Sequence, residues 1–147
     1  MRSVNAVVRR RIAAEAGRVW DAWLKPELIE QWMFGPAVRD EEIVHLAVDP
    51  RVGGAFSFMV ERDGQTIEHL GKYLELERPR RLVFTWMIAD SAVGSRVIVE
   101  IEDEGSACDV SVTHELHPTW ADHVGQMEAS WRQLLEGLAR VTERADE

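Results

Sequence analysis

The C-terminal part of the chain carries a long helical stripe of apolar residues that any fold has to cover. From Thr119 to about Val141, apolar side chains recur every three or four residues, namely Trp120, Val124, Met127, Trp131, Leu134, Leu138 and Val141. This spacing places them on one face of a helix, with a length of roughly 35 Å. Pro118 precedes this helix, and Thr119 with Asp122 has the form of a capping box at its start. Such a helix, with two indoles on its buried face, requires a large apolar partner.

Composition excludes several classes of protein. With 147 residues, of which 46% are hydrophobic, the chain can bury a core and is not disordered. No apolar run approaches the ~20 residues of a membrane span, and the first residues reach Arg9 without the apolar segment of a signal peptide. The single Cys108 allows no internal disulfide and suits a reducing cytoplasm. A net charge of −9 repels phosphate backbones, so we expect no nucleic-acid partner.

The rest of the chain alternates between two sequence periods. Val4 to Ile12 is predicted as a strand, and two short helices follow it, the first ended by Pro26 and the second by Gly35-Pro36. After Val38 the period changes to two, which is typical of strands. The predicted strands are Ile43 to Val48, Phe56 to Val60, Gln65 to Glu77, Leu82 to Ile88, Arg96 to Glu102 and Ala107 to Glu115, with a hairpin turn at Asp63-Gly64.

This order of elements predicts the fold class. Strands that follow one another in a meander pair antiparallel and leave one apolar face. The C-terminal helix is the one element long enough to cover that face. We therefore predict a single α+β domain over residues 1–147, with a curved antiparallel sheet wrapped around one long helix.

Three segments resemble a known family. They are Val19-Trp20-Asp21-Ala22-Trp23, then Asp49 to Phe56, then Pro79 to Trp86. These segments are similar to the homologues of the activator of the heat-shock-protein-90 ATPase, and the order of elements resembles the helix-grip fold of the SRPBCC superfamily. The resemblance implies a ligand cavity between the sheet and the long helix. It also implies a homodimer, the form common among helix-grip proteins.

Within that fold, aromatic and polar residues of the sheet and the long helix are the candidate cavity walls. They are Phe56, Phe58, His69, Tyr73, Phe84, Trp86, His114, Met127 and Trp131. His114, and His69 in the same way, is either a polar anchor inside the cavity or a hydrogen-bonded core histidine. Trp20 and Trp23 should be plain core. The alternative for the whole set is a filled core, because protein interiors normally pack without voids.

The sequence offers little that points to catalysis or metal binding. His114-Glu115-Leu116-His117 lacks the spacing of H-E-x-x-H, and Pro118 prevents one helical turn, so we expect no metal. Cys108 has no basic neighbour that would make it reactive. The acidic pair Glu41-Glu42 is interpreted as a solvated face. We assign no catalytic residue and no cofactor.

We therefore predict that the chain binds a small apolar or amphipathic molecule. One alternative is a protein-interaction module for a chaperone ATPase, as the family resemblance implies. Another is a cyclase-like, aromatase-like or hydrolytic enzyme that uses His69 or His114 in the same cavity. A thermal-shift screen with lipids and aromatic metabolites, run beside a chaperone pull-down, would separate the first two classes.

Overall fold

The computed structural model describes residues 4–35, 38–88 and 94–143. In chain order its elements are β1 (Val4–Ile12), α1 (Ala16–Leu24), α2 (Pro26–Trp32), β2 (Glu42–Val48), β3 (Ala55–Arg62), β4 (Gln65–Glu77), β5 (Arg81–Ile88), β6 (Ser95–Asp103), β7 (Cys108–Leu116), the 3₁₀ turn η1 (Pro118–His123) and α3 (Val124–Glu143). Every strand that the sequence predicts is present, with ends that differ by two residues or fewer.

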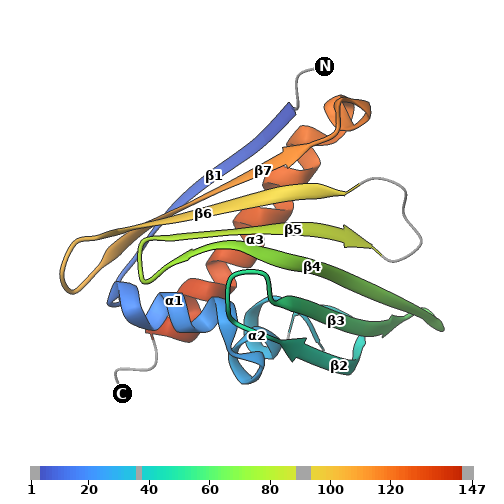
Figure 1. Cartoon of the computed structure of the whole chain (residues 1–147), viewed down its shortest axis with the longest axis horizontal. Coiled ribbons are helices and arrows are strands. Elements are labelled where there is room, and N and C mark those ends of the chain that lie inside the picture. The colour runs from blue at the N-terminus through green and yellow to red at the C-terminus, as the bar shows by residue number, and fades with distance from the viewer. Residues whose placement is uncertain (1–3, 36–37, 89–93, 144–147) are drawn as a thin grey trace.

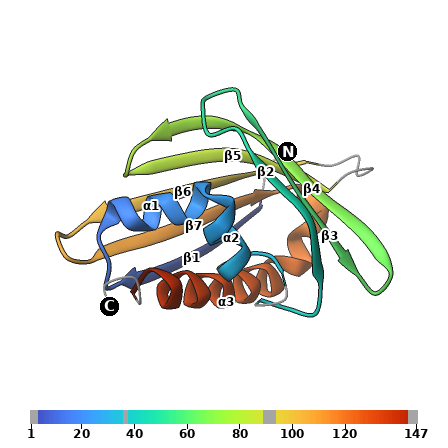
Figure 2. The same ribbon diagram turned by 90° about the horizontal axis from the view of Figure 1, so that it is seen from below.

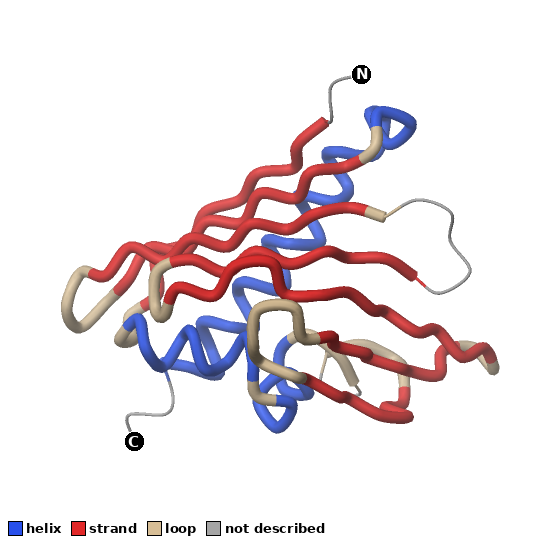
Figure 3. Tube along the Cα trace, in the orientation of Figure 1, coloured by secondary structure: helices blue, strands red, loops and turns tan. Residues whose placement is uncertain are grey.

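The strands form one antiparallel sheet of seven, in the order β1-β7-β6-β5-β4-β3-β2. It curves around one side of the molecule, and α3 runs along the side that it encloses (Figures 1 and 2). The two short helices α1 and α2 lie between the sheet and the C-terminal half of α3 (Figure 2). The tube in Figure 3, in the orientation of Figure 1, shows the long helix crossing behind the strands. The predicted α+β helix-grip fold is confirmed.

Strand β7 shows why this sequence forms a sheet with one buried face. Its residues alternate strictly, so that Cys108, Val110, Val112, His114 and Leu116 are all buried, while the residues between them are half-buried. Side chains of alternate residues point to one face of a strand. Val112 pairs with Val99 on β6 and with Val8 on β1, which makes an apolar row across the sheet. This row packs in the same core as Leu135 and Leu138 of α3.

The middle of β4 has a close backbone approach followed by a bulge. A Cβ atom on Gly71 would lie 1.9 Å from the backbone oxygen of Thr85 and 2.7 Å from Cζ of Phe56, so only glycine fits there. The pairing with β5 then shifts register between Tyr73 and Glu75. Bulges of this kind increase the local twist and bend of a strand.

The two edges of the sheet differ in how they are covered. At the β1 edge, carboxylates from α3 accept hydrogen bonds from outward backbone N–H groups. Glu128 Oε2 accepts from Val7 N and Glu143 Oε2 accepts from Ala13 N, each at 2.9 Å. Glu136 Oε1 accepts from Nε of Arg10 on the same strand at 2.6 Å. Strand β2 forms the other edge.

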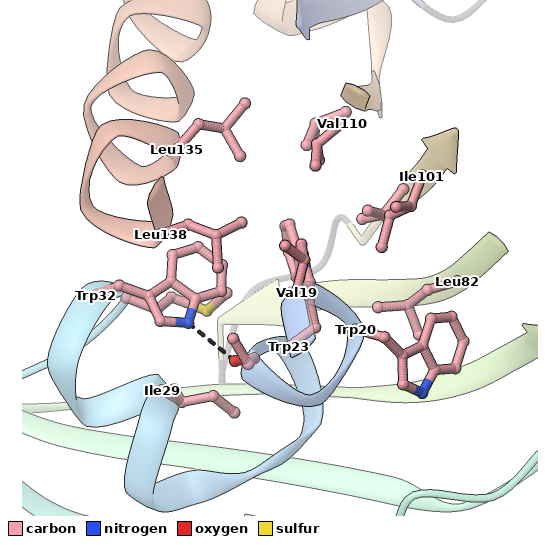
Figure 4. Packing of buried hydrophobic residues seen from close by; sticks show 14 of the residues in the cluster. Val19, Trp20, Trp23, Ile29, Trp32, Leu82, Ile101, Val110, Leu135 and Leu138 are labelled. Atoms are coloured by element: carbon pink, nitrogen blue, oxygen red, sulfur yellow. Dashed lines mark hydrogen bonds between the residues drawn. The ribbon is translucent and has the colours of Figure 1, made fainter. Parts of the chain in front are cut away.

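The core between the three helices is dominated by indole rings (Figure 4). The Trp32 indole N–H donates to the Ala22 carbonyl at 2.9 Å, which ties α2 to α1. Trp23 meets Trp32 edge-on, with ring centroids 4.7 Å apart. Trp20 and Trp23 are both buried, as the sequence predicts for core residues. Gly137 of α3 lies directly over the backbone of Trp32.

The start of the long helix differs from the prediction. The α-helix begins at Val124 and not at Thr119, because Pro118–His123 forms the 3₁₀ turn η1. The cap is the His117 side chain, whose Nδ1 accepts from Thr119 N, so the predicted capping box of Thr119 and Asp122 is wrong. A 3₁₀ turn has about three residues per turn, which moves its side chains off the α-helical stripe. Trp120, predicted on the buried face, is 44% exposed.

Candidate functional site

A cavity of about 460 Å³ lies between the ends of the central strands, the segment around Phe34 and the first half of α3. Most of its lining residues are apolar: Met33, Phe34, Trp86, Met87, Ile88, Leu116, Trp120, Met127, Trp131 and Leu134. The remaining lining residues are Arg39, Arg62, His69, Gly94, Ser95, His114 and Ser130. An apolar wall with a few polar groups is the usual composition of a small-molecule site.

Five of the nine predicted wall residues line this cavity. They come from four elements: His69 from β4, Trp86 from β5, His114 from β7, and Met127 and Trp131 from α3. The structure thus brings together residues that lie up to 62 positions apart in the sequence (131 − 69).

The other four, Phe56, Phe58, Tyr73 and Phe84, lie outside the cavity lining and pack against one another. Phe56 contacts the other three, with ring centroids 4.9 to 5.6 Å apart. They leave a space of only about 10 Å³, which Trp23 and Met33 close from the helix side. Burial raises the pKa of the Tyr73 hydroxyl well above its ordinary value. These four rings lie behind the cavity wall. Trp86 lines both the cavity and the small space beside the four rings, so it connects the two.

A chain of hydrogen bonds fixes His114 in the wall. The indole N–H of Trp131 donates to His114 Nδ1 at 3.2 Å, and Ser95 Oγ lies 2.7 Å from His114 Nε2. Because the Ser95 hydroxyl donates to the Trp86 carbonyl at 3.1 Å, the proton in the second bond belongs to Nε2. His114 is therefore neutral, with both ring nitrogens occupied. Burial lowers its pKa to about 4, in agreement with this pattern.

His69 stands in the wall with one ring nitrogen unused. Its Nδ1 donates to the Phe58 carbonyl at 3.3 Å. The ring packs against both Phe34 and Trp86, at centroid distances of 4.7 and 5.4 Å. Burial lowers the pKa of His69, and the nearby Arg62 and Arg39 act in the same direction. Its Nε2 is left as a hydrogen-bond acceptor with no partner among the residues that the structure describes.

One end of the cavity carries a charged cluster that the sequence analysis missed. Glu41 is only 3% exposed, so its interpretation as part of a solvated face is wrong. Its Oε1 accepts from Arg62 Nε and Nη2 at 3.1 and 2.6 Å, and its Oε2 accepts from Arg39 Nη1 at 3.2 Å. Oε2 also accepts from the backbone N–H of Gly35 at 2.8 Å. Both oxygens are thus fully used.

The local backbone explains why Glu41 turns inward. Gly35 has a φ of +108°, which aims its N–H at the carboxylate. Burial alone would raise the pKa of Glu41, but the bonds from Gly35, Arg62 and Arg39 outweigh it and hold that pKa below the ordinary value. No local sequence motif predicts this cluster, because Arg39 and Glu41 lie in the loop before β2 whereas Arg62 lies on β3.

The described residues give no site for metal or thiol chemistry. Among residues 4–35, 38–88 and 94–143, no group of three or more His, Cys, Asp or Glu side chains could hold a metal ion. His117 caps η1, and His123 pairs with Gln126. Cys108 is buried, and burial raises the pKa of its thiol to about 11. In the same ranges, no helix is long and apolar enough to cross a membrane.

Fold and cavity together define the class of protein. A curved antiparallel sheet that encloses a long C-terminal helix, with a cavity between them, is the helix-grip architecture of the SRPBCC fold family, whose members bind ligands in a cavity. The family can be named more closely. A sequence model of the "Activator of Hsp90 ATPase homolog 1-like protein" family matches residues 13–143, and the chain belongs to this family.

Solved structures agree with this assignment. The AHSA1-like protein from Aeromonas hydrophila is 26% identical, with a TM-score of 0.79 over 97% of this chain and 94% of that one. A protein from Nitrosomonas europaea has the same fold at 19% identity, with a TM-score of 0.81 over 97% and 96% of the two chains. DynU16, a protein of the dynemicin biosynthetic locus, is 22% identical with a TM-score of 0.76, and the match covers 95% of this chain and 47% of DynU16. No curated protein matches the chain significantly.

Proposed function

We propose that this protein binds a small apolar or amphipathic molecule in the cavity between the sheet and α3. The observation that carries the proposal is the cavity itself, about 460 Å³ in volume and lined mainly by aromatic and aliphatic side chains. Ligand pockets usually measure about 300–1,000 Å³. Protein interiors otherwise pack at the density of organic crystals. A space of this size beside a well-packed aromatic cluster therefore favours a ligand-binding site.

The polar groups of the wall support binding more than catalysis. Both ring nitrogens of His114 are occupied by Trp131 and Ser95, so this histidine shapes and stiffens the wall. Its role as a polar anchor is therefore to orient Trp131. His69 Nε2 is the free acceptor, and a hydroxyl or amide on a ligand can donate to it. An enzymatic use of the cavity would have to rely on His69.

The test is binding of a neutral fluorescent probe, N-phenyl-1-naphthylamine, to the purified protein. We expect saturable binding with an increase in fluorescence. Met127→Trp places an indole inside the cavity and should weaken binding of the probe at least about tenfold, with little loss of stability because space is available. The matched control is Ala129→Trp on the exposed side of the same helix, which should bind the probe like the parent.

The contrary result is equally specific. If the parent binds no probe and Met127→Trp lowers the free energy of unfolding by about 1–3 kcal/mol, the space is a filled core. The family resemblance supports a chaperone ATPase as partner and a homodimer, and the single Cys108 supports a cytoplasmic location. A pull-down with the chaperone and sedimentation of the pure protein test the first two.

A further inference from the structure

Resting on the proposed binding function, we propose that the ligand is a carboxylate, an apolar body with one anionic head. The head lies at the end of the cavity formed by Arg39 and Arg62, and the apolar body lies along Phe34 and Trp86 toward α3. Both arginines line the cavity, and their side chains are 33% and 36% exposed, so a ligand can reach them.

The charges at this end of the cavity do not cancel. Two guanidiniums share one carboxylate, Glu41, whose side chain is fully buried. The cluster therefore has a net charge of +1 (two positive, one negative). None of the described residues that line the cavity is acidic. Burial holds the pKa of His69 below its ordinary value, so near neutral pH this ring adds no charge. A single negative charge on the ligand would complete the balance.

The arginines also have hydrogen-bonding capacity to spare. Arg62 uses Nε and Nη2 on Glu41, and Arg39 uses Nη1. Each guanidinium has more N–H donors than these bonds occupy, and the fork geometry suits a carboxylate. Glu41 in contrast has no capacity left, because each of its oxygens already accepts two bonds. The cluster can accept an anion without first breaking its own bonds.

The cluster is joined directly to the apolar wall. The Arg39 guanidinium carbon lies 5.7 Å from the centroid of the Phe34 ring. Phe34 in turn stacks on Trp86, with centroids 6.1 Å apart and planes inclined by 8°. An anionic head at Arg39 would thus continue into a hydrophobic body against these two rings. If the ion pairs of Glu41 served only to hold β3 to the loop before β2, one arginine would be enough to balance its charge.

The experiment compares three probes of equal chain length but different charge. Decanoate, decanol and decylammonium each displace the neutral N-phenyl-1-naphthylamine from the protein at pH 7.5 and low salt. We expect decanoate to bind roughly 10- to 100-fold more tightly than decanol, the range for a hydrogen bond to a charged group, and decylammonium to bind most weakly.

Variants assign the preference to the cluster. Arg39→Gln should reduce the advantage of decanoate over decanol by roughly tenfold or more. Glu41→Gln removes the competing negative charge, and its single amide oxygen can accept from only one of the two arginines, which leaves the other guanidinium for the ligand. This variant should increase decanoate affinity while decanol affinity stays constant. The control is Arg51→Gln, an exposed arginine that does not line the cavity. Thermal melts are the check that each variant is folded.

The outcomes separate the two proposals. If the neutral probe binds and decanoate and decanol compete equally, the carboxylate inference is wrong, and the binding function stands. A decanoate preference that survives unchanged in both Arg39→Gln and Glu41→Gln also overturns the inference. If the neutral probe itself does not bind, the proposed function fails and the inference with it.

Discussion

Protonation of His114 should destabilise the fold in mildly acidic solution. In the folded protein, Nδ1 of His114 accepts a hydrogen bond from the Trp131 indole N–H. A second proton on the ring would sit on Nδ1 and face that indole N–H, so two donors would meet in a buried site. Burial of the ring lowers the folded-state pKa to about 4. The unfolded chain has an ordinary histidine with a pKa of about 6.5.

The sign and size of the effect follow from these two values. Between about pH 6.5 and pH 4 the unfolded state binds the proton and the folded state does not, so stability falls as the pH falls. From pH 7.5 to pH 5.5, the contribution lost through His114 is about 1.3 kcal/mol. Carboxylates titrate mainly below this window. His69, whose pKa is also lowered, adds a loss of the same sign.

The assay is urea unfolding at several pH values, for the parent and for His114→Gln. The glutamine amide offers an acceptor and a donor but does not titrate, so the variant should lose about 1.3 kcal/mol less than the parent between pH 7.5 and 5.5. His69→Gln should remove the part of the pH-dependent loss of stability that comes from His69 and leave the part that comes from His114 unchanged. Parallel profiles for the parent and His114→Gln would refute the argument, because His114 would then titrate alike in both states.

Two further substitutions test the bend in β4 and the charged cluster. Gly71→Ala should cost more than about 3 kcal/mol or prevent folding, because its Cβ would overlap the Thr85 oxygen. Gly125→Ala, in α3 with no atom within 4 Å of the new Cβ, should stabilise by about 0.5–1 kcal/mol, and the opposite order in urea unfolding would contradict the account of the bend. Glu41→Ala should cost about 2–4 kcal/mol, because it leaves two guanidiniums side by side and the Gly35 N–H unpaired. A loss below about 1 kcal/mol would show that the cluster is an ordinary surface ion pair.

The strands were predictable because their signals are local. The alternation in Cys108–Leu116 and the turn at Asp63-Gly64 each depend on residues within a few positions, and the structure has them as predicted, with positive φ at both turn residues. The start of α3 was not predictable in this way. Trp120, Val124 and Met127 keep helical spacing through Pro118–His123, although that segment is a 3₁₀ turn.

The wall of the cavity was only partly accessible from the sequence. The family resemblance predicts Phe56, Phe58, Tyr73 and Phe84 as cavity walls, and in the structure all four are buried. The resemblance does not say how near the helices come to each residue. Trp23 and Met33 close the space over these four rings, whereas Trp86 and His69 lie further along the bent sheet, where the cavity remains.

The charged cluster depends on backbone geometry that carries no periodic signal. Glu41 stands beside Glu42 at a strand start, a position that usually faces solvent. It turns inward because Gly35 adopts a positive φ and because Arg62 arrives from β3, 21 residues away. Neither fact is encoded in local spacing or composition. The same holds for the bonds of His114, since Ser95 and Trp131 lie 19 and 17 residues from it.

The unequal edges of the sheet limit how copies of this protein can associate. An uncovered strand offers a template on which another chain can add its own strand. At β1 the carboxylates of Glu128 and Glu143 already hold outward N–H groups, so α3 blocks such addition. The other edge strand of the sheet is β2. The register shift between Ile43 and His45 makes this edge irregular, which disfavours the addition of another strand. If two copies of the protein associate by pairing their edge strands, the pairing must therefore involve β2, beside β3, which supplies Arg62. Because one edge is blocked, such pairing cannot continue from copy to copy into a fibre.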